Sequence, residues 1–110
     1  MMDGKYTPGP EVSTITVSGG GITLSVARYG KVCTVSMSSQ TTAAITNWTQ
    51  LCQMPEGYRP AVAVFADNIA SDGVDYLCIQ PASNGGGVYS GADLPSGHYL
   101  YITATYVVGG

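Results

Sequence analysis

The sequence predicts an all-β protein and, more narrowly, an antiparallel β-sandwich. About seven short segments combine β-branched or aromatic residues with alternating polarity. Turns that contain Gly or Pro separate these segments, and no stretch shows a helical apolar period of useful length. At 110 residues, the chain has the size of one domain.

The beginning of the chain reads as an extended lead-in, because Pro8, Gly9 and Pro10 oppose regular structure. We therefore assign residues 1–10 to a linker and residues 11–110 to a single folded domain. The lead-in also suggests that this chain is the end of a longer protein.

The first strand is expected over Glu11–Ser18, followed by a turn at Gly19–Gly21. The polarity of this strand alternates only weakly. We therefore expect it to lie at a sheet edge or against a neighbouring subunit.

The next two strands are predicted to form a hairpin over Ile22–Ser38. All apolar residues share one face if the loop has an even length, whereas a three-residue loop would mix the faces. A two-residue loop would place Tyr29 at positive φ, which a bulky residue resists. We therefore predict a four-residue loop, Arg28–Lys31, in which Gly30 takes any left-handed position. This register pairs Val26 with Cys33, Leu24 with Val35 and Ile22 with Met37.

Two strands are expected in the middle of the chain, after a loop over Gln40–Asn47. Trp48–Met54 breaks strict alternation, which predicts a bulge or bend before Pro55. Ala61–Ala66 is apolar on both faces, so we expect a central strand that is covered on each side or closed by a neighbouring subunit.

The last part of the chain is predicted to contain a strand over Val74–Gln80 and a closing strand over His98–Val107. We expect Tyr89–Gly97 to form a loop. In the closing strand, alternation sets a core face against a stripe of tyrosines and threonines. The core face carries Leu100, Ile102 and Ala104, and the stripe carries Tyr99, Tyr101, Thr103 and Thr105.

The composition argues against several classes of function. The net charge is −3, and the only cations are Lys5, Arg28, Lys31 and Arg59. Binding to nucleic acid is therefore not expected, because it depends on neutralising phosphates. No run approaches the roughly 18 apolar residues of a membrane span, so no membrane insertion is expected. Charged residues make up only 10% of the chain, which suits a protein that packs against copies of itself.

The residues that could support catalysis or bind metal are few. Cys33, Cys52 and Cys78 have no metal or redox spacing and are interpreted as reduced cysteines. His98 is the only histidine, and no nucleophile motif accompanies it, so we expect no enzyme activity. Asp67, Asp72 and Asp75 surround a bend that could gather oxygens for calcium, but their spacing matches no established loop, and turn formation explains them better. We therefore expect neither a metal nor a cofactor.

The aromatic residues favour binding. Eight tyrosines and one tryptophan accompany a single phenylalanine, and each tyrosine joins a flat apolar ring to a polar tip. Tyr29, Tyr89 and Tyr99 lie in or beside predicted loops, and Tyr101 lies on the predicted outer face. Sugars and protein partners both suit such side chains. Trp48 is interpreted as a core or interface anchor rather than a sugar platform.

The most specific stretch is Leu51–Pro60, in which a Pro-Glu-Gly turn is followed by Tyr-Arg-Pro. Pro55 and Gly57 make the turn, Pro60 forces Arg59 to be extended, and Glu56 can face Arg59. We expect this motif to fix how one sheet crosses to the next. Other characteristic stretches are the hairpin Ile22–Ser38 with its Arg-Tyr-Gly-Lys-Val turn, the region Ile79–Val88 and the closing strand His98–Val107.

From about Ile22 onward, these features resemble the C-terminal head domain of phage tail-fibre and baseplate receptor-binding proteins. The family pattern usually has leucine where this chain has Met54. The resemblance implies a jelly-roll-like sandwich that forms a homotrimer at the tail tip of a virion assembled in the bacterial cytoplasm. It implies contacts with other tail or baseplate proteins and binding of a host cell-surface carbohydrate without catalysis.

The candidate site is placed in the predicted loops Asp67–Asp75, Asn84–Asp93 and Gly97–Tyr99. Tyr89 would supply a stacking face, Asp93 and His98 would supply hydrogen bonds, and Tyr99 would lie beside them. Two other functions stay open. The domain could be a structural cap that trimerises the fibre, or a fragment of a capsule-degrading enzyme.

Overall fold

The computed structural model describes residues 12–70 and 75–109. They form eight strands and one short 3-10 helix, so the predicted all-β class is confirmed. The strands are β1 (Val12–Gly19), β2 (Ile22–Tyr29), β3 (Val32–Gln40), β4 (Gln50–Gln53), β5 (Val64–Asp67), β6 (Tyr76–Ile79), β7 (Gly87–Ser90) and β8 (Tyr99–Val107), and the 3-10 helix is η2 (Ala82–Asn84). The lead-in over residues 1–10 and the candidate calcium ligand Asp72 lie outside the described residues.

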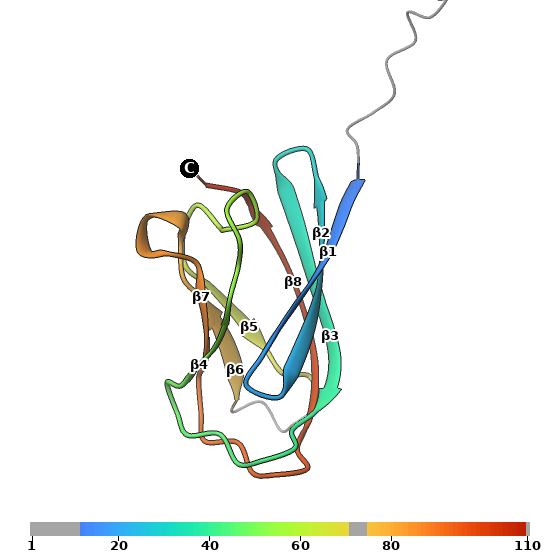
Figure 1. Cartoon of the computed structure of the whole chain (residues 1–110), viewed down its shortest axis with the longest axis vertical. Helices are drawn as coiled ribbons and strands as arrows, with labels where there is room; N and C mark the ends of the chain where they lie inside the picture. The colour runs from blue at the N-terminus through green and yellow to red at the C-terminus, as the bar shows by residue number, and fades with distance from the viewer. Residues whose placement is uncertain (1–11, 71–74, 110) are drawn as a thin grey trace, which may run out of the picture.

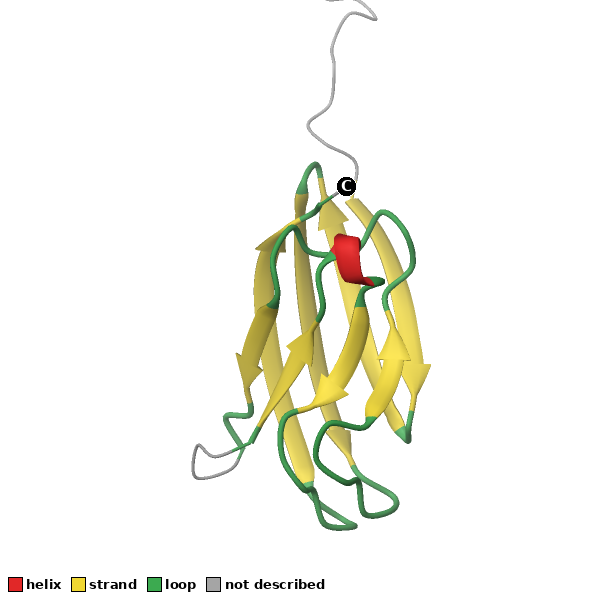
Figure 2. Cartoon of the chain, turned by 90° about the vertical axis from the view of Figure 1, so that its left-hand side faces the viewer, coloured by secondary structure: helices red, strands yellow, loops and turns green. Residues whose placement is uncertain are grey.

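The strands form two four-stranded antiparallel sheets (Figure 1). The first sheet has the order β1-β2-β3-β8, and the second has the order β4-β7-β6-β5. Figure 2 looks onto the second sheet, with η2 near its upper end. Buried residues from the inner sides of both sheets form one apolar cluster, which includes Leu24, Val35 and Ile102 from the first sheet and Leu77 and Val88 from the second.

The hairpin of β2 and β3 has the predicted faces but not the predicted register. Val26 is paired with Val35, and the loop contains only Gly30 and Lys31. The predicted four-residue loop is therefore wrong. The observed two-residue turn lies one residue later than a two-residue turn that would put Tyr29 at positive φ. Gly30 therefore takes the positive φ, of 64°, and Tyr29 stays in the strand. The apolar residues still share one face, because the register differs from the predicted one by two residues.

β1 is the edge strand of the first sheet, as its weak alternation predicted. Its turn to β2 is formed by Gly20 and Gly21, which both have positive φ. Gly19, the last residue of β1, lies against β4 so closely that a Cβ atom would overlap the carbonyl oxygen of Leu51. This contact brings one edge of the first sheet to one edge of the second.

The second sheet departs further from the predictions. A register shift in β4 between Gln50 and Cys52 confirms the predicted bulge. The predicted central strand at Ala61–Ala66 is wrong, because β5 is an edge strand and Phe65 is 62% exposed. The strand β7 was not predicted, so Tyr89 lies within a strand rather than a loop.

The other edges of the two sheets meet through Asn68, which is almost completely buried after β5. Its side-chain oxygen accepts the N–H of Tyr101 at 2.9 Å, and its amide donates to the carbonyl oxygen of Tyr99 at 3.0 Å. The same amide donates to Asp75 Oδ2 at 2.9 Å. Asn68 therefore binds the edge of β8 much as a neighbouring strand would.

The Leu51–Pro60 stretch does not cross between the sheets as predicted, because β4 and β5 belong to the same sheet. Its predicted turn is confirmed by a bond of 3.1 Å from Tyr58 N to Pro55 O and by the positive φ of Gly57. Arg28 donates to the carbonyl oxygen of Gly57 at 2.6 Å, and Tyr106 donates to that of Tyr58 at 2.6 Å. The turn is thus held by the first sheet while it spans the end of the second.

The cysteines in the structure are free, as predicted, with Cys33 and Cys78 buried and Cys52 half-buried. Burial raises the pKa of the Cys52 thiol to about 11. Among the described residues, no helix has the length and apolar character needed to span a membrane.

Candidate functional site

Four aromatic side chains lie on the outer side of the second sheet, away from the core. Phe65 lies opposite Cys78, and Cys78 lies opposite Tyr89, so alternation puts Tyr76 on this side as well. The tryptophan ring packs on Tyr89 from the turn before β4. We call this group the aromatic surface, and it consists of Trp48, Phe65, Tyr76 and Tyr89.

Trp48 is the most prominent member of the aromatic surface. Its ring stacks on that of Tyr89, with centroids 5.0 Å apart and an interplanar angle of 16°. Stacking occupies one face of the indole, and 50% of the residue remains exposed. Of the two predicted roles, the core anchor is therefore wrong and the interface anchor stays a prediction, because the side chain offers an apolar ring to solvent.

The backbone at Trp48 is strained. Its φ is 63°, the one positive φ of a non-glycine residue within the described part of the chain. A bulky residue in this conformation persists only where its surroundings hold it, and such strain concentrates at functional sites. Here Trp48 N donates to Ser90 O at 2.8 Å, and Asn47 N donates to Asp93 Oδ1 at 2.6 Å. Ser90 N in turn donates to Thr49 O at 3.0 Å.

Two glycines in and after β7 make room for the tyrosine rings. A Cβ atom at Gly87 would lie 2.8 Å from the Tyr89 ring, and one at Gly91 would overlap the Tyr76 ring. Both rings therefore lie directly over glycine backbone. The Tyr76 ring meets that of Phe65 edge to face at 5.8 Å, so the aromatic surface consists of two ring pairs, Trp48 with Tyr89 and Phe65 with Tyr76.

Polar groups border these rings. The Tyr89 hydroxyl donates to Gln50 Oε1 at 3.3 Å, and the exposed Asp67 lies opposite Tyr76 on the neighbouring strand. Asp93 is also exposed, next to the turn that carries Trp48. Flat apolar rings edged by amide, hydroxyl and carboxylate groups can hold a ligand that has apolar faces and many hydroxyls.

The structure places the four predicted site residues in two groups. Tyr89 and Asp93 lie together, joined through the Trp48 turn. His98 lies elsewhere and is held by Asp75, with His98 Nε2 2.7 Å from Asp75 Oδ2. Tyr99 follows it in β8, where its ring stacks on that of Tyr101 at 6.3 Å. Both tyrosines are exposed on the outer side of the first sheet.

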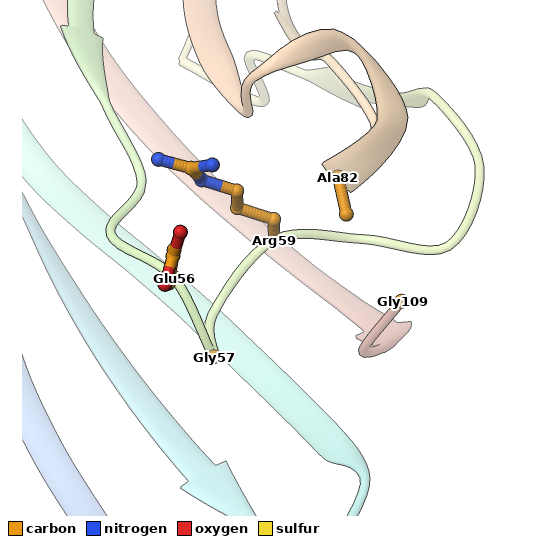
Figure 3. A pocket seen from close by; sticks show the side chains of 5 residues that line it. All are labelled: Glu56, Gly57, Arg59, Ala82 and Gly109. Carbon is orange, nitrogen blue, oxygen red and sulfur yellow. The ribbon is translucent and has the colours of Figure 1, made fainter.

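Two of the hollows in the described part of the molecule are further candidates for a ligand site. One, of about 480 Å³, lies beside Asp93 and is lined mainly by Ile45, Thr46, Leu94 and Pro95. The other, of about 370 Å³, lies at the opposite end of the molecule, and its lining includes Glu56, Gly57 and Arg59 (Figure 3). Arg59 donates to the carbonyl oxygen of Met54 at 2.7 Å, so this arginine supports the turn. We place the candidate site at the aromatic surface and not at this hollow.

The sequence interpretation missed three members of the aromatic surface: Trp48, Phe65 and Tyr76. The signal for Phe65 and Tyr76 would have been the strand β7 beside β6, which was hidden by its first residue, Gly87, and by the glycines on either side of it. No sequence signal would have revealed the positive φ at Trp48, because that conformation normally selects glycine or asparagine.

Metal binding finds no support in the described ranges, where no three His, Cys, Asp or Glu side chains are grouped so as to hold an ion. No protein-family model matches the chain, and no curated protein matches it.

Proposed function

We propose that this chain is the head domain of a phage or prophage tail-fibre or baseplate protein and that it binds a host cell-surface carbohydrate without catalysis. The observation that carries the proposal is the half-exposed Trp48 ring, held at a strained φ and stacked on Tyr89. Maintaining a strained and exposed tryptophan costs stability, and binding is the simplest reason to retain it. The resemblance of the Leu51–Pro60 stretch and the β2–β3 hairpin to this family supplies the biological setting.

The ligand chemistry follows from the rings and their borders. A pyranose ring has an apolar face of C–H groups that fits an exposed indole, and its hydroxyls can bond to Gln50 and Asp93. Such contacts are individually weak. Several copies acting on one cell surface would strengthen them through effective concentration, which is the role we assign to a homotrimer at the tail tip.

We assign a jelly-roll-like sandwich, and the nested antiparallel pairs β3·β8, β4·β7 and β5·β6 support it. We also assign the protein to the virion, in contact with other tail or baseplate proteins. Tyr99, with its exposed partner Tyr101, is proposed as a second ring contact, and His98 would border it.

The test is binding of the fluorescently labelled domain to host cells, with the purified surface polysaccharide as competitor. We expect Trp48→Ala and Tyr89→Ala to abolish most binding. Val62→Ala is the matched control, because Val62 is exposed but does not belong to the aromatic surface. Binding of a Tyr99→Ala variant to host cells tests the second ring contact, which predicts weaker binding than that of the wild type.

Three outcomes would each overturn the proposal or one part of it. If the wild-type domain binds no cells, the alternative of a structural cap takes its place. If binding survives both aromatic substitutions, the carbohydrate does not bind at this surface. Release of oligosaccharides from the polysaccharide would contradict the non-catalytic assignment.

A further inference from the structure

The outer side of the first sheet carries a continuous row of exposed apolar residues. Val12 lies opposite Tyr29, Tyr29 opposite Val32, and Val32 opposite Val107. The row therefore crosses all four strands, and each of its members is exposed. Neither composition nor resemblance indicated this row, because its members come from four separate segments.

The described strand residues on the rest of this face carry mostly hydroxyl groups, and none of them is charged. The exposed Lys31 lies beyond them, in the turn between β2 and β3. Successive cross-strand rows contain Thr14, Ala27, Thr34 and Thr105, and then Thr16, Ser25, Ser36 and Thr103. Together with Ser18, Thr23, Ser38 and Tyr101, they make up what we call the hydroxyl face. Gln40 and Tyr99 pair beyond the last of these rows and are not part of this face, so Tyr99 stays accessible as the second ring contact. Soluble surfaces usually carry about a quarter or more of charged residues, so an uncharged face of four strands is unusual.

The hydroxyls of this face bond partly to each other. Ser18 Oγ and Thr23 Oγ1 are 3.2 Å apart, and Thr34 Oγ1 and Thr105 Oγ1 are 3.5 Å apart. Hydroxyl groups that already have partners cost less to remove from water. The threonine methyl groups then contribute apolar area beside the row.

We propose that the hydroxyl face, including the apolar row, is the surface through which this chain associates with a second copy of itself. An uncharged face can meet an identical face without placing like charges together. Four strands of about eight residues span roughly 19 by 26 Å, or about 500 Å² in projection. Two such faces approach the roughly 1,000 Å² that a specific interface requires.

Self-association here would orient the candidate carbohydrate site. The hydroxyl face and the aromatic surface lie on the outer sides of different sheets, with the core between them (Figures 1 and 2). Copies joined through the hydroxyl face would therefore turn their aromatic surfaces outward. Two identical faces meet about a two-fold axis, so this contact joins copies in pairs and is separate from the three-fold contact of the proposed homotrimer.

The test is the solution mass over a dilution series, measured by light scattering and sedimentation. We expect the wild-type mass to be an even multiple of 11.4 kDa, because contact between two identical faces joins copies in pairs. Val32→Lys, in the middle of the row, should raise the dissociation constant at least about tenfold, because it places like charges together in the interface. Val62→Lys is the control, since it adds the same charge at an exposed valine outside the hydroxyl face.

Thr34→Lys provides a second variant within the hydroxyl face, in case Val32→Lys does not fold, and circular dichroism checks the fold of each variant. A wild type that stays monomeric at high micromolar concentration would overturn the inference. So would an oligomer that both face variants leave intact, or one that Val62→Lys dissociates equally. Polysaccharide binding by the monomeric variants is measured in a separate experiment. A wrong assignment of the interface can therefore be distinguished from a wrong assignment of the carbohydrate site.

Discussion

Asp93 Oδ1 accepts the backbone N–H of Asn47 at 2.6 Å, and this bond ties the loop after β7 to the turn that carries Trp48. The sequence interpretation gave Asp93 the role of a direct ligand contact. In the structure its first role is to position the tryptophan, and its exposure leaves it accessible to a ligand as well.

Replacing Asp93 should therefore weaken the turn. We expect Asp93→Ala to lower the free energy of unfolding by about 1 to 2 kcal/mol, because the Asn47 N–H loses a charged acceptor. Asp93→Asn keeps an acceptor and should retain most of that stability. Urea unfolding measures both effects, and the emission spectrum of Trp48 reports the position of the indole. Equal stability of Asp93→Ala and the wild type would show that this bond does not hold the turn.

At position 48, glycine should give a more stable protein than alanine, which is the reverse of their usual order of stability. Trp48→Gly loses the ring contact with Tyr89 but relieves the strain of a positive φ, whereas Trp48→Ala loses the contact and keeps the strain. We expect the glycine variant to be more stable than the alanine variant by about 1 kcal/mol. Both should lose carbohydrate binding. Thermal unfolding measures the difference in stability between the two variants. An alanine variant as stable as the glycine variant would contradict backbone strain at this site.

The elements that alternation predicted well are those that bury one face only. The two long strands β2 and β3 and the closing strand β8 have the expected inner and outer residues, because each contributes a regular set of apolar side chains to one core. The hairpin register was wrong because its loop depended on the local φ of Tyr29. Moving the turn by one residue gave that φ to Gly30 and changed the register by two residues, so the same side chains still face the core.

The second sheet was harder to predict because its strands have only four residues each. Phe65 and Val64 made β5 look buried on both faces, although Phe65 belongs to the exposed aromatic surface. Glycines hid β7, since glycine has no side chain by which alternation can be recognised. The candidate site was thus found only at Tyr89 and Asp93. Its tryptophan depends on a conformation that no local pattern specifies.

Asn68 should be essential for closing the edge between β5 and β8. Asn68→Ala removes the acceptor of Tyr101 N and the donor to Tyr99 O in a buried setting. We expect a loss of about 2 to 4 kcal/mol in the free energy of unfolding. Asn84→Ala is the control, because Asn84 is exposed and bonds only to the side chain of Gln80 and to its own turn. Hydrogen exchange at the Tyr101 amide should accelerate in the first variant alone, and unchanged protection there would contradict this role.

The cysteines should react slowly while the protein is folded. Burial raises the pKa of Cys52 from the ordinary value of 9.0 to about 11, and it raises the pKa of Cys33 and Cys78 as well. Near neutral pH, the thiolate fraction of Cys52 is then roughly 100-fold lower than that of an ordinary thiol. Alkylation followed by mass spectrometry should show slow labelling in buffer and complete labelling in denaturant. Fast native labelling of Cys52 would contradict its burial.

The same shift makes the fold sensitive to alkali. Between pH 9.0 and about 11, the unfolded chain has lost the Cys52 proton while the folded chain still holds it. The unfolded state then binds fewer protons, so the free energy of unfolding falls as the pH rises through this interval. Cys52→Ser removes this titration and should flatten the decline in melting temperature. If the melting temperature of Cys52→Ser declines equally steeply, the alkali sensitivity comes from the other buried thiols and from Tyr106, whose pKa is also raised by burial.

The close contact between β1 and β4 should tolerate no side chain at Gly19. A methyl group there would overlap the carbonyl oxygen of Leu51, which is backbone and cannot rotate away. We expect Gly19→Ala to cost at least about 2 kcal/mol in the free energy of unfolding, because one strand must move away from the other. Ser18→Ala, at the neighbouring exposed position, should cost less than about 1 kcal/mol, the typical value of its hydrogen bond with Thr23. Chemical denaturation of both variants tests the contact, and a fully stable Gly19→Ala protein would show that these two edges are not packed together.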